Sequence, residues 1–150
     1  MSWLSAGEAA THACVQAVEA AGGEPVPLLR EAGSWTADLP GLDGLILTGG
    51  NAVDPRRYGE ENHGLCRLVI PRRDELEQEA FEHCVGEGKP VLGVCRGMQF
   101  VNVAPDGVVE GVEAADGRFV VGVQFHPEFA GEVPEVAPIF EVLVAHARGR

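Results

Sequence analysis

Basic residues are scarce in this sequence. Only 11 Lys and Arg stand against 23 Asp and Glu, which gives a formal net charge of −12 at pH 7. A protein that binds nucleic acid needs a basic surface for the phosphate backbone. Here the basic residues form only isolated pairs, such as Arg56-Arg57 and Arg72-Arg73. We therefore expect no nucleic-acid partner.

Long apolar runs are also lacking. No run approaches the roughly 18 residues that a membrane-spanning helix needs. The first residues do not show the basic and then apolar pattern of a signal peptide. The sequence therefore predicts no membrane association.

Paired cysteines are absent as well. The four cysteines are scattered and contain no C-x-x-C pair, so neither a disulfide scaffold nor a zinc site is indicated. The histidines show no H-E-x-x-H or similar spacing, which argues against a metal site. We expect reduced thiols and a cytoplasmic location. Cys14 and Cys84 lie on apolar faces of predicted helices, which is typical of core thiols.

Apolar residues make up 45% of the 150 positions, which suits one globular domain over residues 1–150. Helical spacing of apolar residues predicts three helices, and a fourth follows residue 95. Apolar runs predict three strands, and two further β-rich runs predict a hairpin. The helices span 5–21, 76–85 and 136–147, the strands 25–29, 45–48 and 90–94, and the hairpin runs 108–114 and 119–125. This order is typical of an α/β fold with a parallel sheet covered by helices.

One cysteine stands where a strand passes into a helix. The apolar run Pro90–Val94 reads as a buried strand, Cys95 follows it, and Gly93 and Gly97 flank the thiol. Glycines permit the sharp turn and the close packing of a nucleophile elbow. A thiol at a helix N-terminus is also expected to have a lowered pKa. Cys95 is therefore the candidate nucleophile.

A base and its orienting acceptor follow the last predicted strand. His126 and Glu128 lie two residues apart, so an extended backbone would turn both side chains to one side. Each residue also has a structural interpretation: Cys95 as a core thiol, His126 as a hydrogen-bonded structural histidine and Glu128 as a surface charge. Their shared place at the carboxyl ends of strands favours catalysis.

Two glycines and a long loop complete the pattern. Gly49 and Gly50 follow the strand 45–48 and could offer backbone N–H groups to an oxyanion, although a plain tight turn is the simpler interpretation. The Arg96 N–H, just after the elbow, is a second candidate donor. Residues 51–72 predict a long loop, which in a compact domain is usually functional.

These motifs, in this order, resemble class I glutamine amidotransferase-like proteins. Within them, the chain is most similar to the γ-glutamyl-γ-aminobutyrate hydrolase (peptidase C26) group. The segments that carry the resemblance are Thr48–Glu61, Arg73–Glu77, Gly93–Gln99 and Gly122–Glu128. The resemblance covers roughly residues 8–104 and 106–130. It implies a three-layer, flavodoxin-like α/β domain with a mostly parallel sheet and a C-terminal β-hairpin, lacking some family elements.

The resemblance also implies a site and a reaction. Cys95, His126 and Glu128 would form a Cys-His-Glu triad, with an oxyanion hole from backbone N–H groups near Gly50 and Arg96. Gln99 would lie near the glutamyl part of a small-molecule γ-glutamyl substrate. The thiolate would attack the γ-glutamyl amide, release the amine, and leave a glutamyl-thioester for water to hydrolyse. No cofactor is implied.

The chain departs from the family pattern in two places. The expected apolar strand before the first helix is missing, and only 31 positions separate Cys95 from His126, where relatives have several tens more. These departures support an alternative: a shortened, non-catalytic homologue that acts as a binding or assembly module. Its uncovered sheet edge would favour a homo-oligomer. A third hypothesis is an amidotransferase subunit that passes ammonia to a synthase.

Overall fold

The computed structural model describes residues 8–26, 28, 39–64, 66, 68–101, 111–129 and 138–149. Its centre is a four-stranded sheet in the order β1-β2-β4-β3. Strands β1 (Leu45–Leu47), β2 (Val91–Val94) and β4 (Val120–Val123) are parallel, and β3 (Gly111–Glu113) runs antiparallel to β4. The prediction of a mostly parallel sheet that ends in a hairpin is therefore confirmed.

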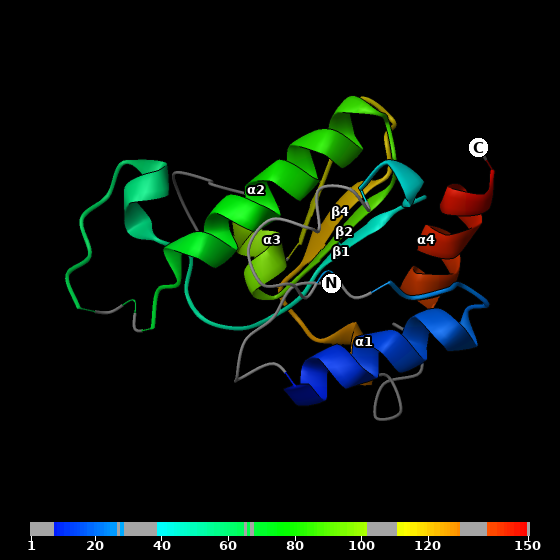
Figure 1. The fold of residues 1–150 in the computed structure, drawn as a ribbon, viewed down its shortest axis with the longest axis horizontal. Helices are drawn as coiled ribbons and strands as arrows, with labels where there is room; N and C mark the ends of the chain where they lie inside the picture. Colours follow the sequence, from blue (N-terminus) through cyan, green and yellow to red (C-terminus); the bar gives the residue numbers. More distant parts are fainter. Residues whose placement is uncertain are drawn as a thin grey trace.

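Helices cover both faces of the sheet. Helices α2 (Pro71–Gly86) and α3 (Arg96–Val101) lie on one face, and α1 (Glu8–Ala20) and α4 (Pro138–Arg148) lie on the other (Figure 1). This arrangement is the expected three-layer α/β architecture.

Alternation along the strands divides the core into two clusters. In β1 the side chain of Ile46 packs in the cluster with α1 and α4, whereas Leu45 and Leu47 pack in the cluster with α2. All three residues are buried. Strands of a parallel sheet are buried on both faces, so they read as continuous apolar runs, and this is the signal that located β1 and β2 in the sequence.

The hairpin places the end of β4 beside the end of β2. Val123 pairs with Val94 in the parallel ladder and with Gly111 in the antiparallel one. The turn between β3 and β4 contains Gly117 at φ 82°, a left-handed conformation that glycine adopts without strain. Strand β4 then leads directly to the predicted His126.

Some expectations differ from the structure. Pro25, Val26 and Leu28 form no strand, because prolines cannot donate to a ladder and the sequence has them at positions 25 and 27. Helix α2 begins at Pro71, five residues before the apolar pattern, since proline is favoured in the first turn. The long loop contains a short 3-10 helix, η3 (Pro55–Tyr58), whose first turn is capped by the Asp54 side chain. Parts of the predicted elements lie outside the described residues, namely residues 5–7, 27, 29, 65, 67, 102–110 and 136–137.

The described part of the chain shows neither a membrane-spanning helix nor a metal-binding cluster. None of its helices is long and apolar enough to cross a membrane. Its His, Cys, Asp and Glu side chains form no group of three that would hold a metal ion.

Candidate active site

Cys95 occupies a sharp turn between β2 and α3, as the sequence predicts. Its φ is 51°, a left-handed conformation that residues other than glycine seldom adopt. Its N–H donates to the Val123 carbonyl across 2.7 Å, which continues the β2–β4 ladder by one residue. The strained residue is therefore the cysteine itself, held in place by the neighbouring strand.

The two glycines of the elbow serve close packing rather than unusual φ. A Cβ on Gly93 would lie 2.6 Å from the Gly97 carbonyl oxygen, and one on Gly97 would overlap the Leu47 carbonyl oxygen. Helix α3 consequently folds back onto β1 and β2 at backbone contact distance. Side chains at either position would push the helix away from the sheet and move Cys95 with it.

His126 and Glu128 meet, although not through an extended backbone. His126 Nδ1 lies 2.7 Å from Glu128 Oε1, but Glu128 sits in a 3-10 helix, η4 (Pro127–Phe129). The turn is closed by the Phe129 N–H, which donates to the His126 carbonyl. The expected extended geometry is wrong because Pro127, with its fixed φ, starts a helical turn. The Glu128 side chain is fully buried and the imidazole is partly exposed.

Gly49 brings the predicted nucleophile and base together. A Cβ on Gly49 would lie 2.9 Å from His126 Cε1 and 3.6 Å from Cys95 Cβ. The glycine thus leaves room for an imidazole beside the thiol. No hydrogen bond joins Cys95 to His126 in the described part of the chain, and catalytic contacts of this kind often tighten only with substrate.

Two glutamine side chains lie beside the thiol. Gln124 Nε2 lies 3.5 Å from Cys95 Sγ, and Gln99 Nε2 donates to Gln124 Oε1 across 3.2 Å. Gln99 is exposed on α3, one helical turn after Cys95, and its N–H donates to the Cys95 carbonyl across 3.1 Å. Gln124 is a site residue that the sequence patterns do not predict. The available signal was its place in the predicted β-rich run 119–125, which leads to His126.

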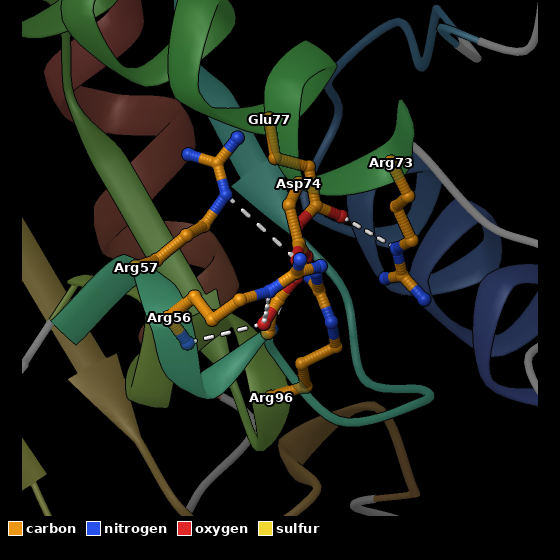
Figure 2. Close-up of polar contacts among 7 residues, drawn as sticks. Arg56, Arg57, Arg73, Asp74, Glu77 and Arg96 are labelled. Carbon is orange, nitrogen blue, oxygen red and sulfur yellow. Dashed lines mark hydrogen bonds and ion pairs between the residues drawn. The ribbon is translucent and has the colours of Figure 1, made fainter. Parts of the chain in front are cut away.

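Four buried charged side chains from α2 and α3 lie together (Figure 2). Arg73 Nε donates to Glu77 Oε1 across 2.8 Å. Arg96 donates to the other oxygen of Glu77 and also to Asp74. The four residues are at most 4% exposed. We call Arg73, Asp74, Glu77 and Arg96 the buried ion cluster; its two positive and two negative charges balance.

The cluster also reaches the turn and the long loop. Arg73 Nη2 donates to the carbonyls of Thr48 and Gly49, each across 3.0 Å. Asp74 Oδ2 accepts the Asp54 N–H across 2.9 Å, which fixes the start of η3. Arg57, from η3, lies 3.8 Å from the same Asp74 oxygen (Figure 2). The first part of the loop is thereby attached to α2.

The ion pairs of the Arg96 side chain could not be predicted from the sequence. The sequence predicts a role for its backbone N–H, whereas its side chain forms ion pairs with Glu77 and Asp74 of α2, 19 and 22 positions earlier in the chain. The Arg73–Glu77 spacing of four residues on one helix face was a readable signal for one of the pairs.

Two other thiols lie in the core, as predicted. Cys14 and Cys84 are fully buried. Burial raises the pKa of Cys14 to about 12, and the negative charge of Glu128 adds to the shift. Burial likewise raises the pKa of Cys84. Both thiols are therefore protonated at neutral pH, which makes them poor nucleophiles.

Comparison with known proteins agrees with this architecture. The peptidase C26 family model matches residues 2–105 and 103–128, in two segments that meet near residue 104. The chain is 46% identical over 65 residues to the glutamine amidotransferase-like protein YvdE homolog of Lactococcus lactis subsp. cremoris, covering 43% of this chain and 35% of that protein. It is 30% identical over 128 residues to Protein NtpR of Enterococcus hirae, covering 83% and 54%.

A shorter likeness extends to a larger enzyme. Over 54 residues the chain is 46% identical to a CTP synthase of Chlorobium phaeobacteroides, covering 35% of this chain and 10% of that protein. The chain spans about half or less of the length of these relatives. The family match itself extends over most of the chain. This protein therefore belongs to the peptidase C26 family, within the class I glutamine amidotransferase-like proteins.

Proposed function

We propose that this protein is a cysteine-dependent hydrolase of γ-glutamyl amide bonds. One observation carries the proposal. Cys95 sits at φ 51° in a strand–turn–helix elbow, and Gly49 leaves space beside it for His126, which contacts the buried carboxylate of Glu128. A nucleophile, a base and an orienting acceptor in this relation suit acyl transfer.

The first half of the reaction acylates the thiol. His126 accepts the Cys95 proton, and the thiolate sulfur adds to the γ-carbonyl carbon of the substrate. Backbone N–H groups of Gly50 and Arg96 stabilise the negative charge that develops on the carbonyl oxygen. The carbon–nitrogen bond then breaks, and His126 delivers its proton to the departing amine.

The second half releases glutamate. Water enters, gives a proton to His126 and adds to the carbonyl carbon of the glutamyl-thioester. The carbon–sulfur bond breaks, glutamate leaves, and the proton returns to the sulfur. Glu128 holds the imidazole through Nδ1 during both halves. Gln99 and Gln124, beside the thiol, are placed to contact the glutamyl part of the substrate.

The substrate is proposed to be a small γ-glutamyl amine, such as γ-glutamyl-γ-aminobutyrate, or glutamine. The full chain is incubated with each compound, and glutamate release is measured. We expect release that is lost in Cys95→Ala and kept in Cys66→Ala, since Cys66 is another thiol that is not fully buried. Equal release by the wild type and Cys95→Ala would contradict the proposal.

A second function is favoured by the family match, which falls into two segments. In this alternative the chain is a shortened, non-catalytic homologue that binds or assembles with other chains, including copies of itself. It predicts no glutamate release by the wild type, together with a sedimentation coefficient that increases with protein concentration. Substrate hydrolysis by a monomer would exclude it.

A further inference from the structure

The Arg73 side chain lies directly behind the Gly49-Gly50 turn. One nitrogen of its guanidinium, Nη2, donates to the carbonyls of Thr48 and Gly49. Another, Nη1, has no hydrogen-bond partner in the described part of the chain and lies where a Cβ of Gly50 would be. Gly50 itself is exposed, whereas Arg73 is buried. The turn therefore has a charged, buried inner side and an accessible outer side.

The contact with Gly49 determines how the next N–H points. In a trans peptide the carbonyl and the following N–H point in opposite directions, and the described residues contain no cis peptide bond. Because the Gly49 carbonyl points to Arg73, the Gly50 N–H points away from it. We propose that Arg73 is a positioning residue that holds the Gly50 N–H in the orientation needed to stabilise the oxyanion. This inference rests on the proposed function.

Reversing this peptide would be unfavourable. The Gly50 N–H would then face guanidinium N–H groups, so donors would face donors. Arg73 would lose an acceptor in a buried position, where an unpaired charged donor is costly. Gly50, at φ 145°, adopts a conformation that L side chains rarely adopt, and any side chain there would overlap Nη1. Arg73 and Gly50 thus restrict the turn to one arrangement.

The same cluster anchors the second proposed donor. Glu77 binds Arg73 through Oε1 and Arg96 through Oε2 (Figure 2). The backbone of Arg96 supplies the N–H that follows the elbow. One carboxylate therefore links the two backbone segments that the oxyanion hole requires, although the segments lie more than 40 positions apart in the chain.

Arg73→Lys tests the inference, with Arg72→Lys as its control on the same helix. Lysine keeps the charge but lacks the planar fork that reaches Glu77 and two carbonyls together. Arg72 pairs only with exposed Glu75 among the described residues. For Arg73→Lys we expect kcat to fall about 10- to 100-fold, less than the roughly 100- to 1,000-fold for complete loss of an oxyanion donor, because the Gly50 N–H is misoriented and not removed. KM and the rate of Cys95 alkylation by iodoacetamide should change less than about 2-fold. Unchanged kcat would overturn the inference.

A spectroscopic readout separates this inference from the proposed function. If the wild type hydrolyses no γ-glutamyl amide, the proposed function fails, and the amide signal of Gly50 in a ¹H–¹⁵N spectrum still reports its peptide. Arg73→Lys should shift this signal and Arg72→Lys should not; an unmoved signal would overturn the inference. If Arg73→Lys does not fold, Glu77→Gln is the substitute variant. Glu77 accepts from Arg73 and Arg96 through its two oxygens, and a glutamine amide has only one oxygen that can accept. The same shift and the same loss of kcat are then expected.

Discussion

His126 Nδ1 lies 2.7 Å from Glu128 Oε1, while the other oxygen of that carboxylate has no hydrogen-bond partner in the described part of the chain. Glu128 therefore has one polar partner there, the imidazole. Because little solvent screens a buried carboxylate, its electrostatic interaction with its single partner is strong. This relation leaves Nε2 as the imidazole nitrogen that does not contact the carboxylate, while Cε1 is the ring atom nearest to a Cβ on Gly49.

Glu128→Gln should reduce activity without unfolding the protein. The amide has the shape of the carboxylate, but it can donate to Nδ1 and so favour the wrong imidazole tautomer. We expect kcat/KM for γ-glutamyl substrates to fall about 100-fold or more. Steady-state kinetics measures the change, and Glu113→Gln, at an exposed position of β3, is the control. A kcat/KM equal to that of the wild type would refute the role of Glu128.

Gly49→Ala should displace the base from the nucleophile. The added methyl group would lie 2.9 Å from His126 Cε1, closer than carbon atoms pack, so the imidazole must move. We expect kcat to fall at least about 10-fold while the far-ultraviolet circular dichroism spectrum is unchanged. Gly86→Ala is the matched control, because a Cβ there meets nothing within 4 Å. Full activity in Gly49→Ala would show that His126 does not act from its present position.

Removing one member of the buried ion cluster should destabilise the fold. Glu77→Ala leaves the buried guanidiniums of Arg73 and Arg96 without their shared acceptor. Breaking a buried ion pair in this way costs about 3–5 kcal/mol. Glu75 lies on the exposed side of the same helix. Glu75→Ala removes only the exposed ion pair with Arg72 and should lower the free energy of unfolding by less than about 1 kcal/mol. Urea denaturation compares the two, and similar midpoints would contradict the prediction.

Cys14 should make the protein less stable in alkaline solution. Its pKa is about 12 in the folded protein against an ordinary value of 9.0, so above pH 9 the unfolded chain releases the thiol proton while the folded chain keeps it. The unfolded state then binds fewer protons, and the free energy of unfolding decreases as pH rises from 9 toward 12. Below pH 9 this contribution is absent.

The measurement is the free energy of unfolding of Cys14→Ala relative to the wild type between pH 8 and 11. We expect the variant to show a smaller decrease over this range. Cys66→Ala serves as the control for loss of a thiol that is not fully buried. Parallel pH profiles for the wild type and Cys14→Ala would show that Cys14 does not cause the decrease.

Short-range patterns predicted most of the framework. Strands β1 and β2 were readable because Leu45–Leu47 and Val91–Val94 are buried on both faces and so form unbroken apolar runs. The elbow was readable because its glycines surround a cysteine between a strand and a helix. The run at residues 25–29 has the same apolar character, but Pro25, Val26 and Leu28 form no strand.

The polar contacts of the site were harder to predict. Arg96 pairs with Asp74 and Glu77 only because α3 and α2 pack on the same face of the sheet, which no local pattern encodes. The contact of Gln124 with Cys95 likewise depends on the pairing of β2 with β4. His126 and Glu128 are predictable as a pair because they are neighbours in sequence, but the 3-10 turn between them differs from the extended backbone that the sequence suggests.

The hydrogen-bonded pairing of β2 with β4 sets the position of Cys95 relative to His126, whatever the length of the chain between α3 and β3. Cys95 is tied by its own N–H to Val123, three residues before His126. The elbow and the histidine are thus registered against each other through two adjacent strands, and not through the connection from α3 to β3. Insertions or deletions between α3 and β3 therefore leave the spacing of the thiol and the imidazole to the pairing of β2 with β4.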